Sequence, residues 1–297
     1  MFGKKTLLIL LITAINLFAQ NGGLSFLKIG FDARNVALGD VGVIAASDVS
    51  ASAYNPALLA EKGNAQVSFT HNSWMTDVSA ELLGAKFNFL GLNWGINLNS
   101  SSIKHIEIRE NPGDAVAMFN ANYFAATLST GFYVTEKISV GAGTRYIYES
   151  LLSETAYGFA FNFGAKYSKV ISNLDLSLSV LNLGSMNELK NEPTQLPSSI
   201  SFGASYLIPI KSDAFGSVAY FAVRKYFNED ATHFNFAVEG NYKKRVYLRV
   251  GYQSGYDARS FSAGLGFSWR GFEIDYAYAP FGYDLGNSHV IGIKYLF

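Results

Sequence analysis

Cysteine is absent from this chain of 297 residues, so the protein has neither a disulfide framework nor a lipid-carrying N-terminal cysteine. Proline is rare, with 6 residues, and only 15% of the residues are charged, against about 25% in average soluble proteins. The formal net charge is zero, which argues against the basic surface that nucleic-acid binding requires. We therefore expect no nucleic-acid partner.

A membrane-spanning apolar run is also missing. The apolar stretch 7–17 is shorter than the roughly 20 residues that a spanning helix needs. It follows two lysines and precedes Ala19, which is the layout of a secretory signal peptide. A signal anchor is the competing interpretation, because Leu17 is not the small residue expected two positions before the cleavage site. If this chain is in a membrane, we expect it to be there as strands.

Aromatic residues, in contrast, are abundant and recur with period two. Over Phe272–Ala279, large apolar residues alternate with polar or small ones, as in a strand with two different faces. Similar segments of about ten residues follow one another along the chain from residue 65. The even number of about fourteen is typical of single-chain bacterial barrels. The expected strands are 65–74, 79–89, 91–101, 118–132, 138–148, 156–169, 174–182, 198–208, 215–225, 232–243, 246–256, 260–269, 272–281 and 287–297.

Connections between these segments alternate in length. Short turns near Leu90, 170–173 and 270–271 would face the periplasm, and longer loops would face the outside, as in bacterial barrels. The connection 208–214 departs from this rule because it is not short. The longer loops expected are 102–117, 149–155, 183–197, 226–231 and 282–286.

The last strand ends at the C-terminus on an aromatic residue. Ile293, Tyr295 and Phe297 share one face of this strand, as expected for the closing strand of an outer-membrane barrel. The pattern also resembles the C-terminal signal that the barrel assembly machinery recognises, so these three residues are candidates for that signal. Outer-membrane lipid and the assembly machinery are accordingly expected partners.

Charged side chains fall opposite the aromatic and aliphatic face of the strands. The polar face is rich in Gly, Ser and Ala, which are too small to cover a solvated exterior and suit a packed or water-lined lumen. We therefore expect the apolar face to point outward; a soluble β-sandwich, with the opposite arrangement, is the alternative. The expected lumenal charges are Lys86, Arg145, Lys166, Asp175, Glu239, Arg249, Glu273, Asp275 and Lys294.

Residues 20–64 do not follow the strand pattern. Their length suits a plug in the lumen or a short periplasmic extension. The residue before proline avoids the helical region, so Asn55–Pro56 indicates a turn, with Pro56 opening a short helix over 57–61. The fold class expected is all-β: a transmembrane antiparallel barrel of about 14 strands with an N-terminal lumenal hatch. The chain then divides into signal peptide 1–19, hatch 20–64 and barrel 65–297.

This N-terminal segment resembles the PorV/PorQ family within the wider FadL-like outer-membrane barrels. In that family, G-x-x-A-R-x-x-x-L/M-G is followed by small residues, an aspartate and N-P-A. The segment Phe281–His289 also resembles the family's final loop. The matching hatch positions are Gly30, Ala33, Arg34, Leu38, Gly39, Asp48, Asn55, Pro56 and Ala57.

The resemblance implies a location in the outer membrane of a Gram-negative cell. It also implies an accessory role in type IX-like protein secretion, with secretion subunits or cargo bound at the extracellular rim. A FadL-like passive channel for small hydrophobic molecules, gated by the hatch, is the alternative, and a structural barrel with no open path is a third. Arg34 is the residue we expect to fix the hatch, paired with one of the lumenal acids.

No residue pattern indicates catalysis. The four histidines show no metal-ligand spacing. Ser288 and His289 are neighbours in a strand, so their side chains point to opposite faces and cannot easily pair. The pairs Gly141–Gly143 and Gly264–Gly266 lie inside strands, where small inward residues making room in the lumen explain them better than a nucleotide loop. We expect no enzyme activity, no metal and no cofactor.

Overall fold

The structure is a computed structural model that describes residues 24–61, 63–74, 78–109, 115–190 and 192–297. The predicted signal peptide, 1–19, lies outside the described residues. Within the described residues, helices are short, and none has the length and hydropathy needed to span a bilayer.

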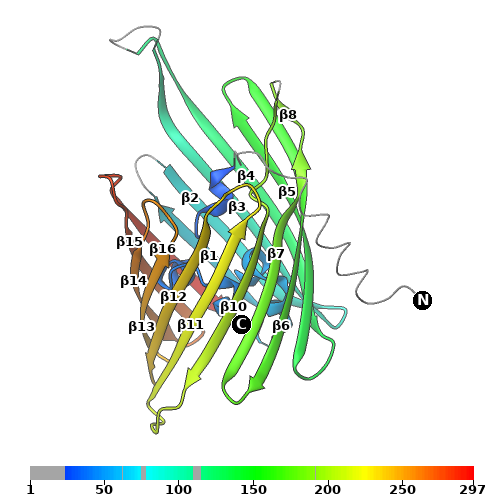
Figure 1. Ribbon diagram of the computed structural model, residues 1–297, viewed down its shortest axis with the longest axis vertical. Coiled ribbons are helices and arrows are strands. Elements are labelled where there is room, and N and C mark those ends of the chain that lie inside the picture. Colours follow the sequence, from blue (N-terminus) through cyan, green and yellow to red (C-terminus); the bar gives the residue numbers. More distant parts are fainter. Residues whose placement is uncertain (1–23, 62, 75–77, 110–114, 191) are drawn as a thin grey trace, which may run out of the picture.

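Fourteen strands of the described chain close into an antiparallel barrel (Figure 1). Each strand pairs with its neighbours in sequence, and β1 closes the barrel against β16, with Gln66 opposite Leu296. The predicted fold class is confirmed. The barrel strands are β1 Gln66–Ser73, β2 Val78–Phe89, β3 Leu92–Ile108, β4 Ala117–Tyr133, β5 Ile138–Leu151, β6 Glu154–Ile171, β7 Leu174–Met186, β10 Ser199–Ile208, β11 Phe215–Tyr226, β12 Thr232–Tyr242, β13 Val246–Ser254, β14 Phe261–Trp269, β15 Phe272–Pro280 and β16 Asn287–Leu296.

The two ends of the barrel differ. The end called here the turn end carries the connections 90–91, 172–173 and 270–271, and there Phe297 N donates to Ala65 O at 2.9 Å. The opposite end, the loop end, carries the hairpin of β8 (Glu188–Leu189) and β9 (Glu192–Pro193) between β7 and β10. In outer-membrane barrels short turns face the periplasm, so we expect the loop end to be the extracellular one.

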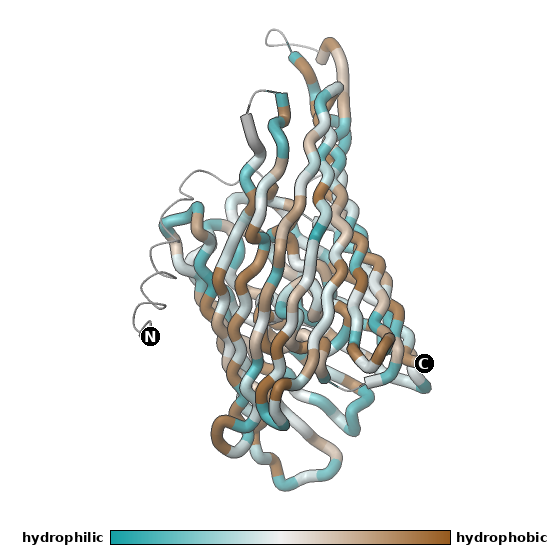
Figure 2. Tube along the Cα trace, turned by 90° about the vertical axis from the view of Figure 1, so that its right-hand side faces the viewer, coloured by the Kyte–Doolittle hydropathy of each residue, from teal (hydrophilic) through white to brown (hydrophobic). Residues whose placement is uncertain are grey.

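The wall of the barrel is taller on one side. Strands β3, β4 and β6 have 17, 17 and 18 residues, whereas β13, β14 and β15 have 9 each. Figures 1 and 2 show the β3–β4 hairpin and its neighbours projecting beyond the rest of the loop-end rim.

This height corrects three of the predicted loops. The segments 102–117, 149–155 and 183–197 are partly strand, and 149–155 reduces to a tight turn between β5 and β6. The reason is physical: past the membrane both faces of a strand are wet, so the alternation of hydrophobicity ends while the hydrogen-bond ladder continues.

The predicted orientation of the two faces is confirmed. Phe161 and Leu265 are 53% and 54% exposed on the outside, whereas Asn162, the residue that follows Phe161 in β6, is fully buried inside. In Figure 2 hydrophobic and hydrophilic positions alternate along the strands. Large side chains thus cover the lipid-facing surface, and the small and polar face lines the lumen.

The lumen is filled by the hatch, the name used from here for the described residues 24–61. Asp32 caps one of its helices by accepting a hydrogen bond from Asn35 N, and Asn55 caps another by accepting from Ala57 N. Pro56 opens that last helix, as predicted. The hatch helices are η2 Ser25–Lys28, α2 Ala33–Ala37, α3 Gly42–Ala45, α4 Ala51–Tyr54 and η3 Pro56–Ala60.

Candidate functional site

The hatch runs along the lumen from the loop end toward the turn end. At the loop end, Leu24 and Phe26 pack in an apolar cluster with Met186 and Leu196, and the Phe26 ring stacks on Tyr123 at 5.2 Å between centroids. At the other extreme, η3 packs against β4, β5 and β6. The hatch therefore contacts the wall over most of the length of the lumen.

A line of three glycines receives the N-P-A motif. Gly131, Gly141 and Gly164 face one another across β4, β5 and β6 in direct register. A Cβ atom on Gly131 or Gly141 would overlap the backbone of Pro56, and one on Gly164 would overlap the Asn55 side chain. Only glycine lets the hatch backbone come this close to the wall. We call these three residues the glycine seat.

Arg34 is fixed by a fork of hydrogen bonds to one acid. Its Nε and Nη2 donate to the two carboxylate oxygens of Glu239, each at 2.9 Å, and its Nη1 donates to the carbonyl of Ala45. Arg249 then links Glu239, at 2.6 Å, to Asp275. A bidentate arginine–carboxylate pair is the strongest and most directional form of ion pair.

Two further cations join the hatch to the wall near the turn end. Lys294 contacts Asp48 of the hatch and Glu273 of β15. Lys166 contacts Glu61 of the hatch and lies 3.0 Å from Asp175. Each lysine therefore bridges one hatch carboxylate and one wall carboxylate. We call Arg34, Glu239, Arg249, Asp275, Lys294, Asp48 and Glu273 the turn-end network.

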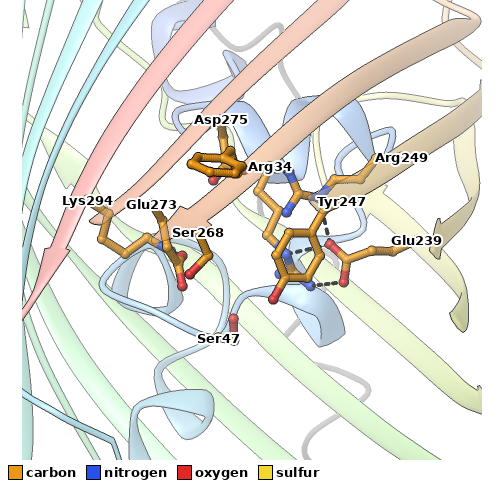
Figure 3. A pocket seen from close by; sticks show the side chains of 10 residues that line it. Arg34, Ser47, Glu239, Tyr247, Arg249, Ser268, Glu273, Asp275 and Lys294 are labelled. Carbon is orange, nitrogen blue, oxygen red and sulfur yellow. Dashed lines mark hydrogen bonds and ion pairs between the residues drawn. The ribbon is translucent and has the colours of Figure 1, made fainter. Parts of the chain in front are cut away.

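A cavity of about 200 Å³ lies beside this network (Figure 3). Arg34, Glu239 and Arg249 lie on one side, and Glu273 and Lys294 on the other. Arg34 and Ser47 also line a neighbouring cavity of about 370 Å³ that reaches Lys166. Three cations and three acids line the first cavity, so it suits water better than an apolar solute.

Two carboxylates of the hatch, Asp32 and Asp48, have pKa values shifted in opposite directions. Burial, together with the charge of Asp48, raises the pKa of Asp32 to about 6, although Asn35 donates two hydrogen bonds to it. Burial also opposes ionisation of Asp48. Its contact with the Lys294 ammonium and the donors of Ser50 outweigh that effect and hold the pKa of Asp48 well below its usual range.

Most predicted lumenal charges meet the hatch or one another. Lys86 is buried and donates to the carbonyl of Glu61, whereas Asp175 and Glu273 lie at the periphery and remain about a quarter exposed, at 26% and 29%. Arg145 lies apart from the turn-end network, on β5. The roles assigned to these residues stay predictions.

The remaining residues of the hatch motif lie in the lumen, and the predicted C-terminal signal lies on the last strand. Gly39 has a φ of 62° and packs on the backbone of β13. Gly30, Ala33, Leu38 and Ala57 are buried in the hatch. Ile293 and Phe297 face outward, and the Tyr295 ring packs at a tilt against Phe272, with 4.7 Å between centroids. The assembly signal therefore lies on the lipid face, and its role stays a prediction.

Sequence reasoning missed the polar residues that hold the hatch backbone. Asn72 donates to the carbonyl of Gly30, Asn97 to that of Val49, and Ser177 to that of Val43. The sequence does place Asn and Ser at inward positions of the strands. Without the register of the strands and the path of the hatch, however, it does not show that these side chains bind the hatch backbone rather than water.

Ser288 and His289 point to opposite sides of β16. Ser288 is buried and donates to Asn72, whereas the exposed His289 bonds the hydroxyl of Tyr276 at 2.8 Å. Among the described residues, no group of three or more His, Asp or Glu side chains could hold a metal ion. Because their side chains lie on opposite faces of β16, Ser288 and His289 do not form a nucleophile–base pair.

The fold and its filled lumen define an outer-membrane β-barrel with an internal hatch. Residues 17–164 match the family described as Type IX secretion system protein PorV, a match that spans the hatch and ends inside β6. The N-terminal half of the chain is thus similar to the PorV family, and the resemblance expected from the hatch motif is confirmed. A comparison with curated proteins gave no match.

Solved structures with the same fold are distant in sequence. The CymD monoaromatic hydrocarbon channel has a TM-score of 0.60 at 11% identity, covering 90% of this chain and 98% of that one. The Pseudomonas putida toluene transporter TodX has a TM-score of 0.58 at 13% identity, covering 89% and 96%. A Pseudomonas aeruginosa FadL homologue has a TM-score of 0.53 at 13% identity, covering 90% and 98%. At these identities the similarity shows a FadL-like barrel fold.

Proposed function

We propose that this protein is an accessory component of type IX-like protein secretion that binds secretion subunits or cargo at its extracellular rim. The observation that carries the proposal is the family match over the hatch and the first strands. The filled lumen supports it, because the hatch is joined to the wall by ion pairs, by the glycine seat and by hydrogen bonds to its backbone. An interior closed in this way favours a role of the outer surfaces over passage through the lumen.

The rim offers a surface suited to a peptide. Pairing of β7 with β10 begins at Leu181 opposite Ser199, so beyond this point β7 pairs only with β6. Within the described residues, no backbone hydrogen bond joins 183–186 to 194–198. A cavity of about 220 Å³ lies there, lined by Met186, Leu196 and Phe227 among others. An open strand edge beside an apolar pocket is the combination that binds an extended segment of another chain.

A passive channel for small hydrophobic solutes is the second candidate. It is favoured by the similarity of the fold to structures described as monoaromatic hydrocarbon channels. For this function the hatch would have to leave its seat, because the turn-end network and η3 occupy the lumen. The two candidates therefore differ in whether the hatch must move.

Purification of the native protein in mild detergent separates the two. We expect secretion subunits or secreted chains to co-purify with the wild type and to be lost from Phe227→Glu, which places a charge in the rim pocket. Lys190→Gln, an exposed change on the nearby hairpin, is the control and should retain them. Bound lipid or hydrocarbon with no protein partner, together with hydrocarbon uptake by reconstituted vesicles, would overturn the proposal in favour of the channel.

A further inference from the structure

One buried arginine of the wall has no acid partner in the part of the chain that the structure describes. Arg145 of β5 is 2% exposed, and its Nε and Nη1 donate to Thr127 at 2.9 Å and to Asn182 at 2.6 Å. Among the described residues, no carboxylate lies within ion-pair distance of it. A guanidinium carries five donors, so three of its N–H groups have no hydrogen-bond partner there. A buried charge without a counter-charge is costly, and structures normally supply one.

A second arginine lies at the same place with the same deficit. Arg224 of β11 donates to the hydroxyl of Ser201 at 3.2 Å and to the main-chain carbonyl of Asp40 at 3.4 Å. Within the described part of the chain it forms no ion pair. The Asp40 carboxylate is bound instead by Arg259, at 3.4 Å. Both of these arginines line one small cavity between the hatch and β5, β7, β10 and β11.

The charges that line this cavity do not balance. Lys28, Arg145 and Arg224 supply three positive charges and Asp40 one negative charge, an excess of two. Lys28 forms an ion pair with Glu229 of the β11–β12 connection, and Asp40 forms one with Arg259. Each of these two pairs is neutral in itself. The two arginines of the wall are left facing the cavity. This imbalance, enclosed in protein, attracts an anion.

The size of the cavity limits what it holds. It measures about 30 Å³, enough for one or two water-sized groups and too little for a sugar, a nucleotide or an acyl chain. Guanidinium forks match the two oxygens of a carboxylate. The aromatic side chains of Tyr54 and Tyr226 complete the lining.

We propose that Arg145 and Arg224 form a binding site for one small monovalent anion, chloride or a carboxylate group, held between the hatch and the wall. Hatch residues from Leu27 to Phe31 cover this site. The anion would supply the counter-charge that the described chain does not, and so would fasten the loop-end part of the hatch. Binding of the anion and seating of the hatch are then coupled, because each stabilises the other.

Thermal unfolding of the full chain in detergent tests the site. Sodium chloride and sodium acetate are titrated into a HEPES buffer poor in small anions, with sodium sulfate at matched ionic strength as the oversized anion. We expect the wild-type midpoint to rise and saturate with chloride or acetate and not with sulfate. Arg145→Gln should raise the half-saturating concentration at least tenfold. Whichever of the two anions acts at the lower concentration identifies the natural chemistry.

Two variants keep the test decisive. Arg224→Gln should lose the response in the same way, and it serves if Arg145→Gln does not fold. Lys104→Gln, an exposed cation on β3, should respond as the wild type does. Arg145→Gln should also be at least as stable as the wild type in the anion-poor buffer, because it removes an uncompensated charge. A wild type with no saturable response, an equal response to sulfate, or unchanged responses in both glutamine variants would overturn the proposal.

Discussion

At the turn end of the lumen every cation of the network contacts a carboxylate. At the loop end, Arg145 and Arg224 line a cavity and form no ion pair with any described residue. The turn end is held by directional ion pairs and by the glycine seat. The loop end is held by apolar packing around Leu24 and Phe26. The same hatch is thus fastened by two kinds of interaction, and they respond differently to substitution.

This difference bears on which part of the hatch opens more easily. Apolar packing has no preferred direction and weakens gradually, while a bidentate pair with Glu239 holds one geometry. Under the proposed function, the loop end is also the end at which partners bind. We therefore expect the loop-end part of the hatch to open before the turn-end part. Hydrogen exchange read by mass spectrometry on hatch peptides resolves the two parts separately.

Phe26→Ala should have the largest effect and should act at the loop end. The Phe26 side chain is 4% exposed and stacks on Tyr123, so its truncation should cost about 3–5 kcal/mol in local opening. Peptides covering 24–31 should exchange faster, and those covering 48–60 should not. Phe163→Ala on the lipid face is the control. Equal acceleration throughout the hatch would mean that the two ends open as one unit.

Glu239→Gln should act at the turn end of the hatch. It leaves Arg34 without its carboxylate and deprives Arg249 of one of two partners, at a cost of about 3 kcal/mol, since the adjacent cavity gives some access to water. Exchange should rise over 33–46 and remain unchanged over 24–31. Glu136→Gln, in an exposed turn at the same end, is the matched control. Exchange that increased first at 24–31 would contradict the expectation that the ion pairs with Glu239 hold only the turn-end part of the hatch.

Much of the barrel could be predicted from the sequence, because period-two alternation directly records lipid on one side and lumen on the other. The strand extensions of β3 and β4 could not, because alternation stops where both faces meet water. The glycine seat needed the register: Gly141 and Gly164 are far apart in sequence, and only the pairing of β5 with β6 aligns them.

The partners in the ion pairs could not be predicted from the sequence either. Arg34 was expected to meet an acid, and four acids were available on inward positions. Which one it meets depends on where the hatch turns between α2 and α3, and the sequence pattern does not record that. Likewise Arg145 was expected among the lumenal charges, but nothing in the pattern indicated that it lacks a carboxylate. The face on which a strand residue lies follows from its odd or even position along the strand. The residue that it contacts is decided by tertiary packing.

Arg34→Ala should have a smaller effect than Glu239→Gln at the same site. Removal of the cation leaves Glu239 paired with Arg249 at 2.6 Å, so no acid becomes isolated. The cost should be about 1–3 kcal/mol, mainly from the lost hydrogen bonds to Glu239 and to the Ala45 carbonyl. Protease sensitivity and exchange over 33–46 measure it. An effect equal to that of Glu239→Gln would show that Arg249 does not compensate.

Acidification should produce the smallest change, and it should tighten the hatch. The pKa of Asp32 is raised to about 6 in the seated hatch, so the seated form binds a proton more readily than an opened, hydrated form does. Stability contributed by such a group grows as pH falls from 7 toward its ordinary pKa near 4. Asp48 acts in the opposite sense, because its lowered pKa costs stability only below about pH 4. Between pH 7 and pH 5 the net gain is on the order of 1 kcal/mol. Slower exchange over 33–46 at pH 5, after correction for the intrinsic rate, would report it. Asp32→Asn, which keeps a helix-capping side chain, should abolish the change.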